Sequence, residues 1–171
     1  MARKNDFYCY NIDSNKWREI KTNDMPPSPW DWHVSVVHSR SIFIFGGYDG
    51  FNWVNDFFEY NIDYNSWQEV LTSHDNEVPP TARHSHSCVV YEDSMYVFGG
   101  YDGHYKNDFH WFNFTQNSWS VLKESTGKAP SPWYWTSCTV INENMYLFGG
   151  HDGSRQLNDF YNYNFKTNEW F

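Results

Sequence analysis

The stretch Phe-Gly-Gly-Tyr-Asp-Gly occupies residues 45–50 and occurs again, unchanged, at residues 98–103. It returns with one change, as Phe-Gly-Gly-His-Asp-Gly, at residues 148–153. The copies begin at intervals of about fifty residues, and self-similarity at such a period is typical of solenoids, propellers and other repeat architectures. The chain is therefore expected to repeat one structural unit.

Two further markers follow each glycine pair in a fixed order. The first is an Asn-Asp dipeptide, and the second is a tryptophan that comes after a short turn containing asparagine. Both markers also occur once before the first glycine pair, at Asn5-Asp6 and Trp17. We expect all four tryptophans, Trp17 included, to be buried anchors of outer strands. The later copies of the dipeptide are Asn55-Asp56, Asn107-Asp108 and Asn158-Asp159, and the later tryptophans are Trp67, Trp119 and Trp170.

The hydrophobic pattern within each unit predicts β-strands. Continuous apolar runs bounded by turn residues, such as Ile42–Phe45 before the first glycine pair, suit strands that are buried on both faces. The glycine pair is expected to let a neighbouring strand or blade approach closely. No stretch shows a sustained helical period, so the expected fold is all-β with about fourteen strands. Asparagine tolerates the left-handed conformation that the turns need, and it stands there as Asn15, Asn65, Asn117 and Asn168.

The order of these features resembles the kelch repeat. Each unit has an apolar strand that ends in Gly-Gly, then an Asn-Asp dipeptide, then an aromatic strand and a tryptophan after a turn, at a period of about fifty residues. The resemblance covers nearly the whole chain. It implies a β-propeller in which each repeat forms one four-stranded blade. The run Arg83–Tyr91 and the Asn-Asp-Phe that follows each glycine motif are most similar to kelch domains of the leucine-zipper-like regulator type.

The repeat count predicts a partial propeller, with three four-stranded blades and an N-terminal half blade. A closed propeller usually has four to eight blades. The expected open ends would expose unpaired strand edges and apolar faces, so further propeller blades or other chains are expected to complete the ring. Residues 1–171 form this kelch propeller segment, with the half blade at 4–20 and blades at 28–71, 80–122 and 130–171, the last with a truncated final strand.

Composition restricts the class of partner. The net charge of −9 argues against a nucleic-acid partner, and no run reaches the roughly 18 apolar residues of a membrane helix. The polar N-terminus does not resemble a signal peptide, and the three cysteines are expected to be reduced. We therefore expect a cytoplasmic protein that binds neither nucleic acid nor membrane.

The segments that precede each inner strand differ most between the repeats, and in kelch propellers they reach the same face as the loops after Gly-Gly. The family usually has arginine where Arg83 stands, whereas the other two repeats have tryptophan there. Aromatic, Arg and His side chains of this kind favour a protein or peptide partner on the loop rim, although the two tryptophans could instead pack under the next blade. The candidate partner-binding residues are Trp30, Asp31, Trp32, Arg83, His84, Ser85, Trp133, Tyr134 and Trp135, with Tyr48, Tyr101 and His151 beside them; Trp53 and Tyr105 lie in the same loops.

The motifs predict no catalytic residue, no metal site and no cofactor. His84 and His86 could face one side of a strand and share a metal, but no third ligand is evident. The Gly-Gly-Tyr-Asp-Gly spacing is neither a phosphate loop nor a dinucleotide fingerprint. The favoured function is a non-enzymatic protein-interaction module, and the resemblance implies substrate recognition for a ubiquitin-ligase adaptor. The alternative is a kelch-like enzyme of the oxidase, sialic-acid isomerase or specifier type.

Overall fold

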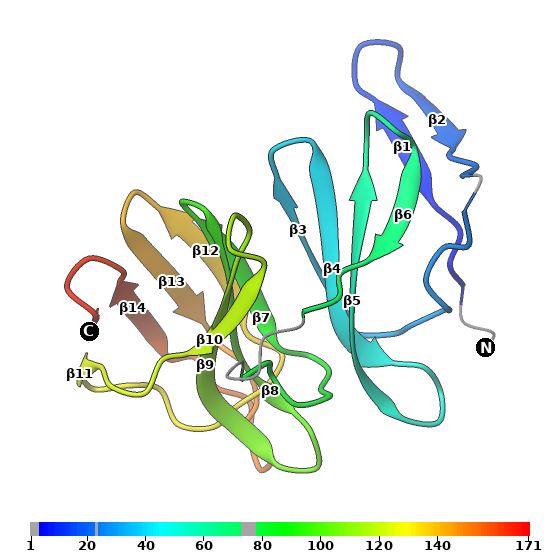
Figure 1. The fold of residues 1–171 in the computed structure, drawn as a ribbon. Helices are drawn as coiled ribbons and strands as arrows, with labels where there is room; N and C mark the ends of the chain where they lie inside the picture. The colour runs from blue at the N-terminus through cyan, green and yellow to red at the C-terminus, as the bar shows by residue number, and fades with distance from the viewer. Residues whose placement is uncertain (1–3, 23, 73–77) are drawn as a thin grey trace.

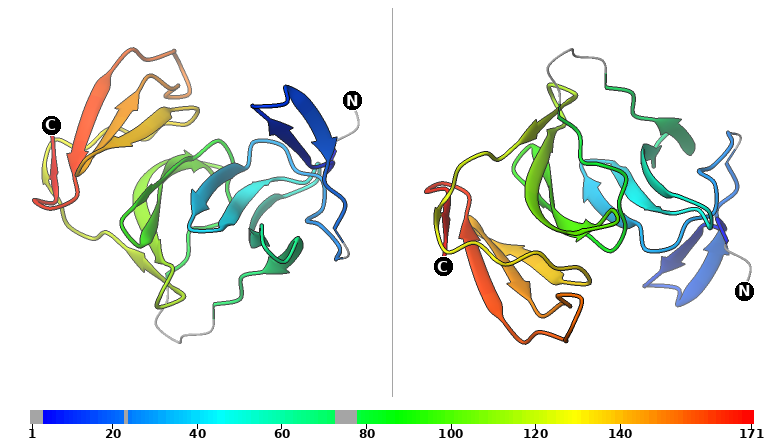
Figure 2. Two further views of the ribbon diagram at one scale, coloured as in Figure 1. Left: turned by 90° about the horizontal axis from the view of Figure 1, so that it is seen from above. Right: turned by 90° about the horizontal axis from the view of Figure 1, so that it is seen from below.

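The structure, a computed structural model, describes residues 4–22, 24–72 and 78–171. These residues form fifteen strands and no helix, so the expected all-β fold is confirmed. The strands make four sheets, antiparallel except for one pair of strands, which are here called blades 1 to 4 and follow one another in chain order (Figure 1). Figure 2 shows these sheets along an arc that leaves the two chain ends apart, so the described residues form a partial propeller that does not close.

The strand bounds repeat from blade to blade. Blade 1 consists of β1 (Tyr8–Asn11) and β2 (Lys16–Glu19). Blade 2 consists of β3 (Val34–His38), β4 (Ser41–Tyr48), β5 (Trp53–Asn61) and β6 (Ser66–Glu69). Blade 3 consists of β7 (Ser87–Tyr91), β8 (Ser94–Tyr101), β9 (Tyr105–Asn113) and β10 (Ser118–Val121). Blade 4 consists of β12 (Ser137–Ile141), β13 (Asn144–Phe148), β14 (Phe160–Asn164) and β15 (Glu169–Trp170).

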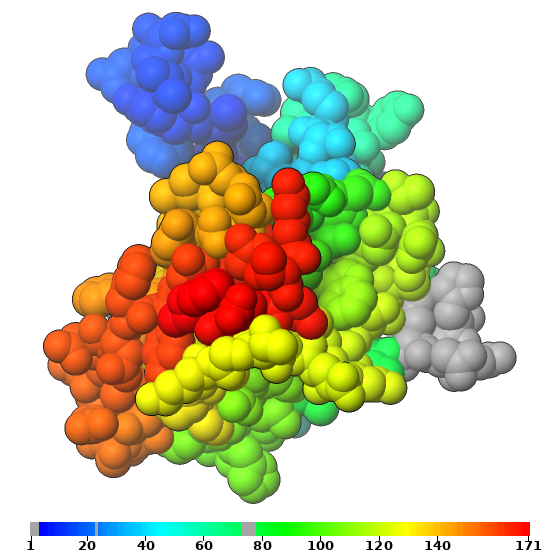
Figure 3. Space-filling model, turned by 90° about the vertical axis from the view of Figure 1, so that its left-hand side faces the viewer, coloured from blue at the N-terminus to red at the C-terminus, as the bar shows by residue number. Residues whose placement is uncertain are grey.

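One strand lies outside the predicted repeat pattern. The short β11 (Thr126–Gly127) pairs in parallel with β15 and adds a fifth strand to the sheet of blade 4. Figure 3 shows the segment that contains β11, in yellow, crossing the molecule beside the red C-terminal residues. The prediction of about fourteen strands missed this one because β11 lies in the connection between two repeats.

The glycine pairs allow the next blade to approach, as predicted. The β4–β5 register shifts between Phe45 and Gly47, where the amide of Gly47 donates to the carbonyl of Arg83 at the start of blade 3 (2.8 Å). Gly46 has φ of +65°, and a Cβ there would lie 2.8 Å from the same carbonyl. The amide of Gly100 donates to the carbonyl of Trp133 in the equivalent way (3.1 Å). Glycine is therefore required by backbone contact between blades as well as by φ.

The turn asparagines also connect neighbouring blades. Asn15, Asn65, Asn117 and Asn168 all have positive φ, between 51° and 58°, which confirms the turn prediction. The Nδ2 of Asn65 donates to the carbonyl of Lys21 (3.0 Å), and that of Asn117 donates to the carbonyl of Leu71 (3.1 Å). Each of these side chains therefore ties a β-turn to the segment that follows the preceding blade.

The core lies between the blades. Trp119 of blade 3 packs against Phe45 and Phe57 of blade 2, with ring centroids 5.2 and 5.5 Å apart. Trp170 of blade 4 packs in the same way against Phe98 and Phe109 of blade 3. The tryptophans of β10 and β15 therefore anchor blades 3 and 4 to the preceding blade, and this buried aromatic surface stabilises the fold.

This arrangement corrects the prediction for Trp17. Trp119 and Trp170 are only 4% and 3% exposed, and Trp67 is partly buried against Phe7. Trp17 is 69% exposed. The prediction that Trp17 is a buried anchor is wrong. These tryptophans are buried by the preceding blade, and no described blade precedes blade 1.

Candidate functional site

The segment that leads into each inner strand pairs with the loop after the glycine pair. In blade 3, His84 and Tyr101 exchange both backbone hydrogen bonds, at 3.1 and 3.0 Å. The same antiparallel bridge occurs in blades 2 and 4. Six of the predicted site residues therefore lie at one end of the blades, here called the rim, at the lower end of the view in Figure 1. These residues are Asp31 with Tyr48, His84 with Tyr101, and Tyr134 with His151.

A second set of backbone bonds joins the blades at the rim. The amide of Ser85 donates to the carbonyl of Trp32, and the amide of Trp135 donates to the carbonyl of Ser85, both at 3.0 Å. All three residues have positive φ, at 58°, 55° and 59°. Tryptophan in this region of φ is strained, and such strain often occurs at functional sites. Trp32 and Trp135 are 51% and 56% exposed and border a hollow of about 390 Å³ that Ser85 also lines.

Aromatic rings form a continuous surface across the three blades. Trp32 lies 5.0 Å from the ring of His84, and Tyr134 lies 4.5 Å from that of Trp135. Tyr101 connects the two pairs, with its centroid 5.6 Å from His84 and 6.2 Å from Tyr134. We call this set the aromatic rim: Trp32, Tyr48, Trp53, His84, Tyr101, Tyr105, Tyr134, Trp135 and His151.

Four predicted site residues do not face solvent. The exposed fractions of Trp30, Arg83, Ser85 and Trp133 are 6%, 0%, 8% and 1%. The prediction that these side chains contact a partner is wrong for Trp30, Arg83 and Trp133, because they are packed inside the fold; Ser85 lines the hollow but offers little surface there. The alternative interpretation, packing under a neighbouring blade, fits Trp133, whose ring lies 6.5 Å from that of Phe98 in blade 3. The ring contacts of Trp30 are with His33 and Phe58 of its own blade. The other eight predicted residues are partly or largely exposed.

The buried Arg83 forms an ion pair instead of a partner contact. Its guanidinium donates to both carboxylate oxygens of Asp108, at 2.6 and 2.8 Å, and to the carbonyl of Gly99. His110 Nε2 lies 3.1 Å from the same carboxylate. Burial alone would raise the pKa of Asp108, but the hydrogen bonds from Arg83 and His110 outweigh it and hold that pKa below its usual range.

The position of Arg83 is filled by aromatic packing in the other repeats. Trp30 packs against Phe58, with ring centroids 5.7 Å apart, and Trp133 packs against Tyr161 at 5.4 Å. Phe58 and Tyr161 stand where blade 3 has His110, since the registers β4–β5, β8–β9 and β13–β14 place them opposite equivalent residues. The same site in the fold is thus stabilised by an Arg–Asp–His network in one repeat and by an aromatic pair in two.

The titratable rings of the aromatic rim favour their neutral forms. Burial lowers the pKa of His84, which favours the neutral imidazole. Burial, followed by the nearby Tyr105 and Tyr101, raises the pKa of Tyr134. Lys106 Nζ lies 3.0 Å from the carboxylate of Asp102, so these loop charges pair locally. Such a surface suits apolar and hydrogen-bonding contacts with a partner.

The histidines considered as metal ligands are separated by burial. His84 Nδ1 lies 2.8 Å from the hydroxyl of Ser85. His86 is 4% exposed, and burial lowers its pKa to about 3. Within residues 4–22, 24–72 and 78–171 there is no group of three His, Cys, Asp or Glu side chains that could hold a metal ion. The described part of the chain also contains no helix that could span a membrane.

The chain matches the model of the KLHDC2/KLHL20/DRC7 Kelch-repeats domain over residues 1–124 and 74–171, and it therefore belongs to the kelch-repeat family. It is 30% identical to mouse Kelch domain-containing protein 1 over 154 residues, which cover 74% of this chain and 37% of the relative. It is 29% identical to the Drosophila melanogaster homolog of leucine-zipper-like transcriptional regulator 1 over 133 residues (74% and 14%). Human Kelch domain-containing protein 3 is 28% identical over 137 residues (75% and 36%). The chain thus spans well under half the length of these relatives.

Proposed function

We propose that this chain is a non-enzymatic protein-interaction module that binds a loop or peptide of a partner protein on the aromatic rim. The observation that carries the proposal is the continuous row of rings from Trp32 to Trp135, contributed by three successive blades. Exposed tryptophan and tyrosine side chains bury a large area for little lost conformational entropy, which is why they are enriched at binding hot spots. Membership of the kelch family supports an interaction role of this kind.

The kelch resemblance extends the proposal to the class of assembly. We infer that the propeller recognises substrates for a ubiquitin-ligase adaptor, in a cytoplasmic protein. The similarity to leucine-zipper-like transcriptional regulators supports this inference. Co-precipitation of a ubiquitin ligase scaffold with the full-length protein, and partner degradation that depends on it, are the expected results. Stable partner levels after deletion of the gene would contradict the adaptor role while leaving rim binding in place.

The rim proposal is tested by affinity measurements with a purified partner. Trp32→Ala and Trp135→Ala remove the two most exposed rings of the rim tryptophans, and each is expected to weaken binding by about 2 kcal/mol, roughly 30-fold. Tyr64→Ala is the matched control, because Tyr64 is 81% exposed in the β5–β6 turn at the other end of blade 2. Unchanged affinity in both rim variants, with unchanged melting temperatures, would refute the proposal.

We also propose that further blades or another chain cover the two end faces. Phe148 and Phe160 of blade 4 are 55% and 64% exposed, and they stand where Phe98 and Phe109 of blade 3 receive Trp170. Trp17 lies in blade 1, at the opposite end of the series of blades. It is an exposed outer-strand tryptophan, the residue type that packs against the equivalent phenylalanine pair elsewhere in the fold. Sedimentation of the isolated chain is expected to show association that Trp17→Ala or Phe160→Ala weakens. A monodisperse monomer for the unmodified chain would contradict this.

A further inference from the structure

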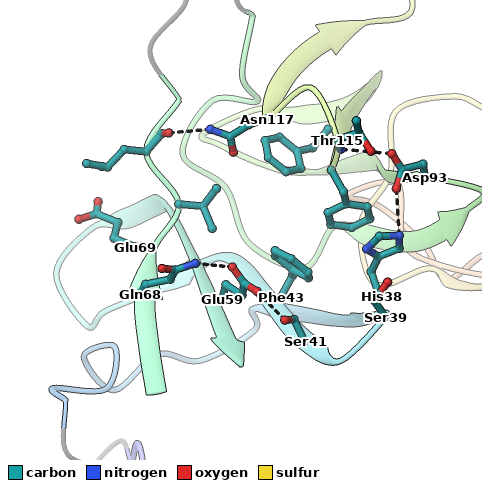
Figure 4. A pocket seen from close by; sticks show the side chains of 14 residues that line it. His38, Ser39, Ser41, Phe43, Glu59, Gln68, Glu69, Asp93, Thr115 and Asn117 are labelled. Atoms are coloured by element: carbon teal, nitrogen blue, oxygen red, sulfur yellow. Dashed lines mark hydrogen bonds and ion pairs between the residues drawn. The ribbon is translucent and has the colours of Figure 1, made fainter. Parts of the chain in front are cut away.

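A groove between blades 2 and 3 lies at the opposite end of the blades from the rim. It has a volume of about 510 Å³ (Figure 4). Ser41 lines the groove at the start of β4, whereas Tyr48 belongs to the rim at the end of the same strand. Seven steps of about 3.3 Å separate these two residues by roughly 23 Å. The groove is thus a separate surface from the aromatic rim.

The floor of the groove is aromatic. Phe43 of blade 2 and Phe112 and Phe114 of blade 3 line it, and the rings of Phe43 and Phe114 lie 4.6 Å apart. His38 stacks on Phe114, with centroids 4.0 Å apart and planes 9° from parallel. Because Phe43 and Phe112 are 7% and 1% exposed and His38 covers one face of Phe114, the floor offers apolar contact rather than open ring faces.

The walls of the groove carry carboxylates from both blades. Glu59 accepts hydrogen bonds from the Ser41 hydroxyl and the Gln68 amide, both at 2.5 Å, and these neutral donors fix its position. Asp93 lies on the blade 3 side of the groove, where its carboxylate is 3.1 Å from His38 Nε2 and accepts a hydrogen bond from the amide of Thr115 at 3.2 Å (Figure 4). Glu69 stands exposed at the edge. The lining of the groove includes no Lys or Arg among the described residues.

Comparison of the repeats shows why the groove is open here. The β4–β5 register pairs Glu59 with Phe43, and the equivalent β8–β9 register pairs Trp111 with Tyr96. In blade 3 the Trp111 ring stacks on Tyr96 at 6.4 Å, and Tyr91 stacks on Phe165 of blade 4 at 4.3 Å. Large aromatic rings thus occupy the corresponding place between blades 3 and 4. A glutamate in place of tryptophan leaves space and negative charge between blades 2 and 3.

We propose that this groove binds an arginine side chain of a protein partner. A guanidinium is planar and forms paired hydrogen bonds with carboxylates, and three apolar methylenes precede it, so an arginine side chain suits the apolar floor and the acidic walls better than an ammonium does. In this arrangement the methylenes of the arginine lie against the aromatic floor, and the positive charge lies beside the Glu59 carboxylate on the acidic side of the groove. The site is a second contact point, independent of the rim.

The test uses two short peptides that differ only in the end group of one side chain, a charged guanidinium in arginine and a neutral urea in citrulline. Acetyl-Gly-Arg-Gly-amide is titrated to about 10 mM against the chain and followed by saturation-transfer difference NMR, which also suits a protein that associates. Acetyl-Gly-citrulline-Gly-amide has the same shape without the charge. The arginine peptide is expected to show saturable transfer to its side-chain methylenes, weakened by salt. The citrulline peptide is expected to bind at least about tenfold more weakly.

Variants assign the binding to the groove. Glu59→Trp introduces the residue of the next blade, fills the space and removes the charge, so it is expected to abolish the transfer. Glu59→Gln is expected to weaken binding at least about fivefold. Glu143→Gln makes the same charge change in the β12–β13 turn of blade 4, away from the groove, and should leave binding unchanged. Equal binding of the two peptides, no binding of the arginine peptide, or unchanged binding by Glu59→Trp would overturn the proposal.

Discussion

The repeated tryptophans offer one substitution in two environments. Trp119→Ala and Trp17→Ala remove the same side chain at equivalent positions, but Trp119 is 4% exposed and Trp17 is 69% exposed. Trp119 contacts the rings of Phe45, Phe57 and Phe112, whereas the ring contact of Trp17 is with Tyr10 of its own hairpin. The free energy of unfolding should therefore respond very differently to the two changes.

The magnitude follows from buried area. A tryptophan side chain contributes roughly 200 Å², and apolar burial stabilises by about 25 cal/mol/Å². At 4% exposure this gives about 5 kcal/mol for Trp119, and at 69% exposure about 1.5 kcal/mol for Trp17. Both are upper values because the unfolded chain and the remaining alanine bury some surface. We expect losses of about 3–4 kcal/mol for Trp119→Ala and about 1 kcal/mol or less for Trp17→Ala.

Urea unfolding followed by far-ultraviolet circular dichroism measures both losses. Trp67→Ala, with its partly buried side chain, should fall between them. The measurements are made at two protein concentrations, because association through the end faces would add a concentration-dependent term for Trp17. Equal losses for Trp17→Ala and Trp119→Ala, or a loss below about 1 kcal/mol for Trp119→Ala, would refute the inter-blade packing.

Two further predictions concern buried charge and pH. Arg83→Met leaves the Asp108 carboxylate without its buried partner and should lower the free energy of unfolding by about 3–5 kcal/mol in urea titrations. Arg40→Met, at the exposed Arg40–Asp63 pair, is the control and should change that free energy little. Similar losses for the two variants would contradict a structural role for Arg83. Burial, then the charge of Arg83, lowers the pKa of His86 to about 3 from 6.5. The unfolded chain therefore binds a proton below pH 6.5 that the folded chain binds only near pH 3, and stability should fall by up to about 1.4 kcal/mol per pH unit as the pH decreases through this window. The His86→Phe variant should lose that slope in pH-dependent melting, and an unchanged slope would show that other groups carry it.

Much of the fold could be predicted because its determinants are local. Apolar runs such as Met95–Phe98 and turn asparagines such as Asn117 repeat in register, and each specifies its strand or turn without reference to distant residues. The glycine pairs could be interpreted as points of close approach for the same reason. Strand β11 was missed because it depends on pairing with β15, a contact between residues about forty positions apart.

Side-chain exposure could not be predicted in the same way. Trp17 and Trp119 share one local pattern, yet their burial depends on whether a preceding blade covers them. Arg83 and Trp135 both belong to the variable segment before an inner strand, but Arg83 points into the packing between blades and Trp135 points outward. The groove beside Glu59 required the register to show that Trp111 is its counterpart.

Site-specific photocross-linking tests the central claim, that the aromatic rim is the interaction surface, most directly. The photoreactive residue p-benzoylphenylalanine replaces Trp32 or Trp135 at the rim, and replaces Tyr64 at the opposite end as the control, in the full-length protein expressed in cells. All three positions are more than half exposed, so the probe is accessible at each of them before binding. We predict a discrete cross-linked partner from both rim positions and none from position 64. Cross-links from position 64 alone, or the same products from all three positions, would contradict the claim.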